Sequence, residues 1–326
     1  MKSLTTKTPF VRMAATAFFF LSISAGNRLL AQINTISATT QHLYISIDDY
    51  GNAAKQYLGS KSDQIGVVVT IYGRDIYPND PLKVNEQTLT AAIAKAFPDS
   101  NAAGIATMDW EGKAFDILAH RDASDPQYQA VLSEFQKALQ IAKSTRPNVK
   151  WGFYDFPFRR IVFTSDQDWK DANSKIAPLL QNMDCFFPAF YMTYSMGDDP
   201  VHKGALASGQ SIYDKDTREA IRLAVKYNKP VLPFIWHRYE VHDSAYRDKV
   251  IPPDQFAALA RTILDATYKG HKVNGIVWWS RDTEFFLHGN KQVRSEASDV
   301  NGFKTRYDSL VTNYSDLLLK QVQKKK

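Results

Sequence analysis

Two acidic residues that flank a tryptophan are the residues of this sequence best suited to chemistry. Asp109 and Glu111 follow the small, apolar stretch 104–108, which has the composition of a buried strand. Because side chains alternate along a strand, both acids are expected on one side and Trp110 on the other. Two carboxyl groups placed this closely raise one another's pKa. Such a pair supplies one protonated and one ionised acid near neutral pH.

Acid pairs of this kind catalyse the hydrolysis of glycosidic bonds. One acid protonates the leaving oxygen, and a second group stabilises or traps the sugar cation; a protein nucleophile would lie across the site, about 5 Å away. Residues i and i+2 of one strand instead lie on the same flank of the sugar. The spacing therefore favours substrate-assisted catalysis, in which Glu111 donates the proton and Asp109 orients the attacking 2-acetamido group. The alternative is that Asp109 only caps the next turn and Glu111 is solvated.

Aromatic and acidic residues at the ends of other apolar stretches would complete a carbohydrate site. Aromatic faces pack on the apolar faces of sugar rings, and phenol hydroxyls reach the polar groups of the substrate. Strand alternation sends one of Trp278 and Trp279 inward and the other into a helix layer. The residues at these strand ends are Asp48, Asp49, Tyr72, Asp109, Glu111, Tyr154, Asp155, Tyr191, Tyr194, Trp236, His237, Tyr239, Trp278, Trp279 and Asp282.

Predicted strands and helices alternate along the chain. Apolar, β-branched runs predict strands at 43–48, 64–72, 104–109, 150–157, 185–192, 230–236 and 274–279. Helical spacing predicts helices at 85–97, 126–146, 169–183, 217–227, 254–269 and 303–320. This order predicts an α/β fold, a (β/α) barrel of the TIM type with about seven to eight parallel strands. An open, doubly wound sheet is the alternative.

The ends of the chain are predicted to lie outside the barrel. Residues 1–31 combine an early positive charge with a short apolar run, which predicts a signal peptide and export to the periplasm, the cell surface or the medium. Residues 32–320 would then form a single catalytic domain, and the lysine-rich residues 321–326 a disordered tail. Cys185, the only cysteine, lies in an apolar run and is expected to be buried, without a disulfide.

Several classes of function find no support in the sequence. Four basic residues and no acid fall within 1–31, so their removal lowers the formal charge from +6 to +2; this near-neutral remainder does not indicate a nucleic-acid partner. No GxGxxG, GxxxxGK[ST], HExxH or CxxC pattern is found, so neither a cofactor nor a metal is predicted. No integral membrane span is predicted, the expected partner is a polysaccharide or oligosaccharide, and the oligomeric state stays open.

Several motifs, in order, resemble the hyaluronidase family of glycoside hydrolases, the animal and venom enzymes. The resemblance covers about residues 65–285. It is carried by Tyr77-Pro78, Gly104-Ile105-Ala106-Thr107-Met108-Asp109-Trp110-Glu111, Ser144-Thr145-Arg146-Pro147, Trp151-Gly152-Phe153-Tyr154-Asp155-Phe156-Pro157, Phe187-Pro188-Ala189-Phe190-Tyr191, Arg218-Glu219-Ala220, Pro230-Val231-Leu232-Pro233-Phe234 with Tyr239, and Gly275-Ile276-Val277-Trp278-Trp279.

This resemblance implies a distorted (β/α) barrel and retaining, endo-type hydrolysis of hyaluronan or chondroitin through the acetamido group. It implies Glu111 as the proton donor and Asp109 as the acid that positions the acetamide. Tyr191 and Tyr239 would contact the sugar beside the reaction centre, and Trp279 would form the floor of an N-acetylglucosamine pocket. Tyr77 is a further expected substrate-binding residue.

The sequence departs from the family at two places. Gly112-Lys113-Ala114 replaces a Trp-Arg-Pro stretch after the acid pair, and Phe158-Arg159-Arg160 replaces Asp-Cys-Tyr. Arg159 and Arg160 could serve a substrate carboxylate or form a solvated turn, and His237 and Arg238 could bind an acidic sugar or be ordinary loop residues. Two alternatives therefore remain: an inactive carbohydrate-binding barrel, or a glycosidase for sugars without an acetamide, with a nucleophile such as Asp155.

Overall fold

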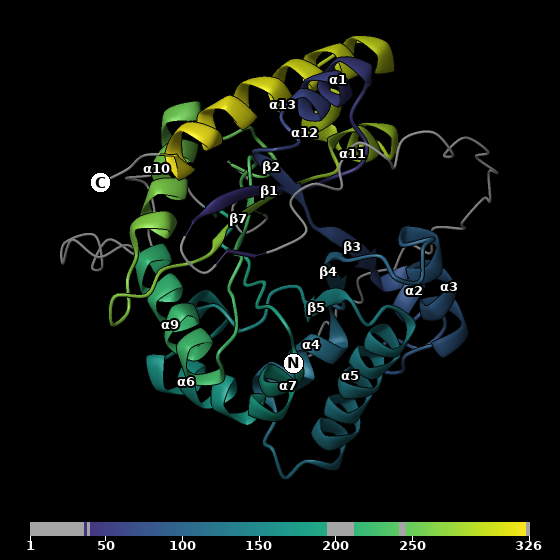
Figure 1. Cartoon of the computed structure of the whole chain (residues 1–326), viewed down its shortest axis with the longest axis vertical. Helices are drawn as coiled ribbons and strands as arrows, with labels where there is room; N and C mark the ends of the chain where they lie inside the picture. Colours follow the sequence, from purple (N-terminus) through teal and green to yellow (C-terminus); the bar gives the residue numbers. More distant parts are fainter. Residues whose placement is uncertain (1–35, 38–39, 194–211, 241–245, 324–326) are drawn as a thin grey trace, which may run out of the picture.

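The computed structural model describes residues 36–37, 40–193, 212–240 and 246–323. The predicted signal peptide, Tyr194 and residues 324–326 lie outside these ranges. The strands are β1 (His42–Ile47), β2 (Ile65–Val67), β3 (Val69–Tyr72), β4 (Gly104–Asp109), β5 (Val149–Phe153), β6 (Phe234–Trp236) and β7 (Gly275–Ser280). They form two parallel sheets at the centre of the molecule, in the orders β2-β1-β7-β6 and β3-β4-β5 (Figure 1).

Helices surround these sheets (Figure 1). They are α1 (Asn52–Ser60), α2 (Gly73–Ile76), α3 (Glu86–Ala96), α4 (Lys113–His120), α5 (Pro126–Thr145), α6 (Asp166–Lys175), α7 (Ala177–Asn182), α9 (Ile212–Tyr227), α10 (Pro253–Asp265), α11 (Asp282–Leu287), α12 (Lys291–Arg294) and α13 (Val300–Val322), with a 3₁₀ turn at Arg160–Val162. The long α13 packs against α1, α10 and α11, and α3 packs against α5. The described residues contain no helix that is long and apolar enough to cross a membrane.

Two irregular segments join the sheets into a distorted (β/α) barrel, as predicted. Between β2 and β3, the Val68 amide donates to Ile45 of β1, while Val69 already pairs with Ala106 of β4. This one stretch therefore passes from the first sheet to the second. On the other side, residues 186–189 form isolated parallel bridges to Tyr154 after β5 and to Phe234 of β6. Parallel pairing thus runs around the whole ring.

Prolines explain where the predicted strands are interrupted. The expected strand at 185–192 is reduced to isolated bridges, because Pro188 has no amide proton to donate. The expected strand at 230–236 becomes regular only at Phe234, after Pro230 and Pro233. The expected helix at 169–183 is two helices, α6 and α7, and Pro178 lies in the first turn of the second.

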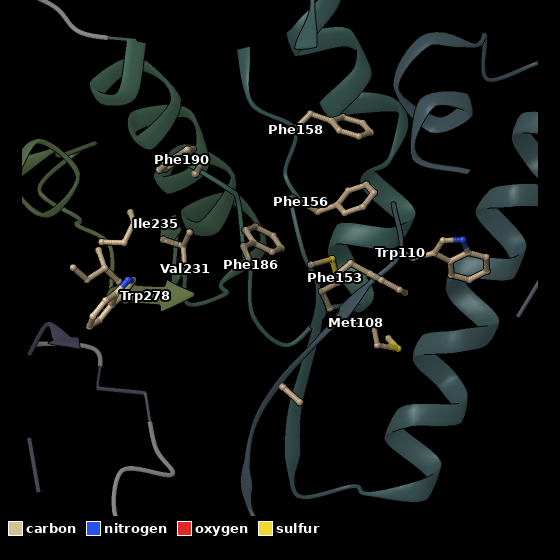
Figure 2. Packing of buried hydrophobic residues seen from close by; sticks show 14 of the residues in the cluster. Met108, Trp110, Phe153, Phe156, Phe158, Phe186, Phe190, Val231, Ile235 and Trp278 are labelled. Carbon is tan, nitrogen blue, oxygen red and sulfur yellow. The ribbon is translucent and has the colours of Figure 1, made fainter. Parts of the chain in front are cut away.

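The apolar core has two parts, one inside the barrel and one between the strands and the helices. Successive residues of a strand contribute alternately to the two parts. Inside the barrel, Tyr44, Val68, Ile105, Phe187 and Val277 belong to a small cluster that also contains Cys185, which is buried as predicted. A much larger cluster fills the space between strands and helices, and Figure 2 shows part of it, with Trp110 and Trp278 on opposite sides of the view. A strand residue therefore either faces the barrel interior or anchors a helix.

Gly152 of β5 is required by a close approach inside the barrel. A Cβ atom at this position would lie 2.2 Å from the carbonyl oxygen of Cys185. The absence of a side chain lets segment 185–189 lie against β5, and this contact brings Tyr191 toward the carboxyl ends of the strands.

Candidate active site

A cavity of about 380 Å³ opens at the carboxyl ends of the strands. It contains both acids of the Asp-Trp-Glu motif and a group of aromatic side chains. Its lining residues are Thr70, Asp109, Glu111, Tyr154, Tyr191, Phe234, Trp236, Glu240, Arg247, Asp248, Trp279, Phe285 and Asn290. In a (β/α) barrel, catalytic residues are found at this end.

A larger hollow, of about 1280 Å³, lies at the opposite end of the strands, next to His42 and Asn274. Asp63 is the only acid among its described lining residues. We place the candidate active site in the smaller cavity because the acid pair lies there. The described residues contain no cluster of three or more side chains suited to hold a metal ion.

Trp110 separates the two acids and fixes the end of β4. Its ring stacks on Phe135 of α5, with centroids 4.4 Å apart, and on Tyr77 on the other side, at 5.4 Å. Its Nε1 donates to the Pro81 carbonyl oxygen at 2.9 Å. Trp110 therefore points into the helix layer, and the residues before and after it both line the cavity, as strand alternation requires.

Gly112 turns the chain immediately after Glu111. Its φ of 70° lies in the left-handed region, which a glycine adopts without strain. This turn starts α4 and leaves Glu111 at the mouth of the cavity, where its side chain is exposed. The Glu111 carboxyl nevertheless lines the cavity, and its burial there disfavours the charged form.

The two acids have different pKa values. Burial, and after it the nearby Asp109 carboxylate, raise the pKa of Glu111 to about 8. Burial also raises the pKa of Asp109, to about 6, but a hydrogen bond with Glu111 and the positive charge of Arg281 oppose this rise. Near neutral pH the pair therefore holds one proton, which resides mainly on Glu111.

Aromatic rings form the wall next to the acid pair. Tyr191 and Trp279 are stacked, with centroids 6.0 Å apart and 19° between their planes. The Trp236 ring meets Trp279 edge-on at 5.4 Å, and Tyr154 lies 6.1 Å from Tyr191. Two buried polar atoms, Nε1 of Trp236 and Oδ1 of Asp109, have no hydrogen-bond partner among the described residues. Polar atoms of this kind are available to a substrate.

Of the residues predicted to bind substrate, Tyr154, Tyr191 and Trp279 line the cavity. Tyr72 and Tyr77 lie beside it without lining it. Tyr72 pairs with Asp109 across β3 and β4, and the Arg281 guanidinium lies over its ring, 4.2 Å from the centroid. Tyr77 stacks on Trp110, and the charges of the two acids contribute to raising its pKa, after burial.

Three more of the predicted substrate contacts do not line this cavity. Trp278 faces the helix layer, where its Nε1 donates to His237 Nδ1 at 3.1 Å, because Val277 and Trp279 occupy the inward positions of β7. Tyr239 is 3% exposed, and its hydroxyl donates to Gln255 at 3.0 Å, outside the cavity.

Asp155 is the third of these predicted contacts. It is 4% exposed and accepts a hydrogen bond from the Ala189 amide at 3.2 Å. It also does not line the cavity, because Tyr154, its neighbour in the chain, takes the inward direction.

The charged residues that follow β5 and β6 are buried pairs rather than free ligands. Arg238 and His237 both bind Asp282, at 2.6 Å and 2.9 Å, on the helix side of the barrel. They are therefore not placed to bind an acidic sugar. Arg159 is not a solvated turn residue either, since it pairs with Glu240.

Sequence reasoning did not assign the part of the cavity formed by Glu240, Arg247, Asp248, Phe285 and Asn290. These residues come from the loop after β6 and from the α11–α12 region. No strand pattern in the sequence identifies them, because they lie beyond the ends of the strands. Trp236 was recognisable as the last residue of a predicted strand, and it lines the cavity.

The chain is similar in sequence to hyaluronidases, although no family model matches it. It is 28% identical over 159 residues to hyaluronidase Tab y 2.0101 of Tabanus yao, an alignment that spans 45% of this chain and 40% of that protein. It is 24% identical over 254 residues to a hyaluronidase of Polybia paulista, across 65% of this chain and 81% of that protein. "Inactive hyaluronidase B" of Vespula vulgaris is 22% identical over 193 residues, across 56% and 50%.

Solved structures share the fold. Bee venom hyaluronidase matches with a TM-score of 0.60 and 16% identity, over 86% of this chain and 99% of that one. The same protein in complex with a hyaluronic acid tetramer matches with a TM-score of 0.55 and 16% identity, over 82% and 99%. This chain is therefore similar to hyaluronidases in sequence, and it shares the fold of bee venom hyaluronidase.

Proposed function

We propose that this protein is a retaining glycoside hydrolase that cleaves next to an N-acetylhexosamine and uses the 2-acetamido group of that sugar as the nucleophile. Glu111 is the proton donor, and Asp109 accepts a hydrogen bond from the acetamide nitrogen. Tyr154, Tyr191 and Trp279 hold the reacting sugar ring.

The reaction has two steps. In the first, the Glu111 carboxyl transfers its proton to the glycosidic oxygen while the bond from that oxygen to C1 breaks. The acetamido carbonyl oxygen forms a bond to C1, which gives a cyclic oxazolinium ion, and ionised Asp109 stabilises the positive charge. In the second, water attacks C1 while the bond from C1 to the acetamido oxygen breaks, and the Glu111 carboxylate takes a proton from that water. Two inversions at C1 give overall retention.

The arrangement of Asp109 and Glu111 is the observation that supports this mechanism. Both acids lie at the end of one strand and line one cavity, and their pKa values differ in the direction that the two roles require. Asp155, the protein nucleophile that the sequence offered, is buried and hydrogen-bonded outside the cavity. A nucleophile supplied by the substrate is consistent with this geometry.

The substrate class follows from the acetamide requirement and from the relatives. The relatives are named hyaluronidases, and one similar solved structure holds a hyaluronic acid tetramer. Hyaluronan and chondroitin, which contain N-acetylhexosamine, are therefore candidate substrates beside uncharged N-acetylglucosamine oligomers. A screen of these three glycans, with the anomer of the first product identified by NMR, tests both substrate and stereochemistry.

A thiazoline analogue of N-acetylglucosamine tests the nucleophile. It mimics the oxazolinium ion, so it should inhibit competitively and bind more tightly than the product. Failure to inhibit, together with covalent trapping of a 2-fluoro sugar on a cavity acid such as Glu240, would instead favour a glycosidase for sugars without an acetamide.

An inactive carbohydrate-binding barrel is the second candidate. The similarity to a protein named "Inactive hyaluronidase B" favours it, and so does the replacement of the family's Trp-Arg-Pro stretch by Gly112-Lys113-Ala114. A binding module does not need a protonated acid, so the pKa of Glu111 argues for turnover. Saturable binding of an oligosaccharide without any product after long incubation would select this candidate.

We also propose that residues 1–31 direct export and that residues 32–320 form the single catalytic domain. The early positive charges and the short apolar run at 14–25 support export. Expression in a bacterium, followed by mass spectrometry of the exported protein, should find a new N-terminus near residues 26–32. Retention of the whole chain in the cytoplasm would contradict this.

A further inference from the structure

Glu240 is an acid of the cavity wall that the proposed reaction does not use. It lies four residues beyond the end of β6, and its amide donates to the Met192 carbonyl oxygen at 2.7 Å. Residues 238–239 pair with 248–250, and these two arms carry Glu240, Arg247 and Asp248 to the cavity. The side chain of Glu240 is 19% exposed, so one face of its carboxylate can reach a bound glycan.

Arg159 binds the Glu240 carboxylate on the side away from the cavity. Its Nη1 and Nη2 donate to the two oxygens of Glu240 at 2.7 Å and 2.8 Å, and its Nε lies 3.4 Å from Asp155. A guanidinium does not lose its proton in proteins, and a bidentate pair fixes orientation as well as distance. Each carboxylate oxygen keeps a second acceptor position, so Glu240 can still accept hydrogen bonds from the cavity side.

Acids outnumber cations on the cavity wall. Asp109, Glu111, Glu240 and Asp248 are acids, and Arg247 is the only cation among the described lining residues. The Asp248 carboxylate accepts a hydrogen bond from Asn290 at 2.8 Å. The cations behind the wall are engaged elsewhere: Arg159 with Glu240 and Asp155, and Arg281 with Glu284 and the Tyr72 ring.

We infer that Glu240, held by Arg159, is a specificity-determining residue that accepts hydrogen bonds from the hydroxyl groups of an uncharged glycan and repels a uronate. This inference rests on the proposed function and narrows its substrate to uncharged N-acetylhexosamine oligomers. Like charges brought together disfavour a wrong ligand more than contacts favour the right one. Arg159 belongs to the segment 158–160 in which the sequence departs from its family, so a changed specificity is consistent with that departure.

Binding to two matched hexasaccharides tests the inference without turnover. Isothermal titration at pH 7, in a Glu111→Gln background, compares an N-acetylglucosamine hexamer with a hyaluronan hexasaccharide. We expect the uncharged hexamer to bind at least tenfold more tightly. Glu240→Gln should weaken binding of the uncharged hexamer and strengthen binding of the hyaluronan hexasaccharide, so the ratio of the two Kd values shrinks at least fivefold. A purely structural role would weaken both.

Glu219 supplies a matched control. It also forms a bidentate pair, with Nε and Nη2 of Arg222 on α9 at 2.7 Å for both contacts, and it does not line the cavity. Glu219→Gln should leave the ratio of the two Kd values unchanged.

Raising NaCl from 50 to 500 mM gives a second measurement that needs no substitution at Glu240. Salt screens the repulsion between Glu240 and a uronate, so it should narrow the difference between the Kd values of the two hexasaccharides.

Four results would overturn the inference. The first is tighter binding of the hyaluronan hexasaccharide than of the uncharged hexamer, especially if Arg247→Gln removes this preference. The others are an unchanged ratio of the two Kd values in Glu240→Gln, a difference between these Kd values that salt does not narrow, and no binding of either hexasaccharide.

The proposed function fails separately. Selective binding of the uncharged hexamer without any turnover would reject hydrolysis and keep the inference. Turnover that prefers hyaluronan would support hydrolysis and reject the inference.

Discussion

Trp110 and Phe135 stack nearly parallel, with ring centroids 4.4 Å apart and 14° between their planes. This contact joins the carboxyl end of β4 to the middle of α5. Because Trp110 lies between Asp109 and Glu111 in the chain, the same contact that stabilises the helix layer also sets where the two acids lie. Core packing and the candidate chemistry therefore depend on one side chain.

Replacing Trp110 should affect stability and activity together. Trp110→Ala removes a fully buried indole, so we expect a loss of about 3–5 kcal/mol in the free energy of unfolding. Trp110→Phe keeps a ring against Phe135 but loses the hydrogen bond to Pro81, which is worth about 1 kcal/mol. Urea unfolding measures both, and activity well below the melting temperature separates misplacement of the acids from unfolding. Full activity in a folded Trp110→Ala protein would contradict the coupling.

Replacing either acid by its amide should slow hydrolysis, for a different reason in each case. Glu111→Gln removes the proton donor, so we expect hydrolysis to fall by about 10²–10⁴-fold while oligosaccharide binding is retained. Asp109→Asn keeps a polar group of the same shape but loses the charge that stabilises the oxazolinium ion, so the rate should also fall strongly. Initial rates and titration of the oligosaccharide measure the two effects. Unchanged turnover in Glu111→Gln would reject the assignment.

The pH dependence of the reaction follows from the two pKa values. The active form has Glu111 protonated and Asp109 ionised. The rate should fall below about pH 6, where Asp109 gains a proton, and above about pH 8, where Glu111 loses one. In Asp109→Asn, the neighbouring negative charge is absent, so the pKa of Glu111 falls and the alkaline limb moves to lower pH. A limb that stays in place would show that Asp109 does not raise the pKa of Glu111.

The two neighbouring tryptophans of β7 should give opposite phenotypes. Trp279 lines the cavity and stacks on Tyr191, so Trp279→Ala should weaken oligosaccharide binding by about tenfold, equivalent to about 1.4 kcal/mol, with little effect on folding. Trp278 is buried in the helix layer, so Trp278→Ala should cost about 3–5 kcal/mol of stability. Titration and thermal unfolding of both variants measure this. Weaker binding in a stable Trp278→Ala protein would instead support the substrate role that the sequence suggested for Trp278.

Asp282 should control stability rather than catalysis. It is fully buried, and hydrogen bonds from His237 and Arg238 together with the Arg238 charge outweigh this burial and hold its pKa well below its usual range. Asp282→Asn leaves Arg238 with Glu296 as its one carboxylate partner among the described residues, so we expect a loss of about 3–5 kcal/mol. Because the folded pKa is depressed, the stabilisation by Asp282 is present above the unfolded pKa, near pH 4, and declines as the pH falls further. The variant should therefore lose less stability than the parent between pH 5 and pH 3 in chemical denaturation.

Local pattern was sufficient to predict the barrel and the acid pair. Apolar runs of strand length, helical periodicity between them, and the two-residue spacing of Asp109 and Glu111 are properties of adjacent residues. The choice between Trp278 and Trp279 was not available from the same pattern, because alternation says that the two point in opposite directions but not which one points inward. The pairing of β7 with β1 and β6 decides it.

The rest of the site depends on residues that the chain brings together from far apart. Arg159 and Glu240 are separated by 81 positions, and Glu240 faces the cavity because the loop arms 238–239 and 248–250 pair with each other. Tyr239 and Asp155 were plausible substrate contacts from the sequence. In the structure, both side chains are buried outside the cavity. The sequence determined which chemistry was possible, since composition and spacing act locally; only the tertiary structure decided which charges meet, since burial and pairing depend on the closure of the barrel.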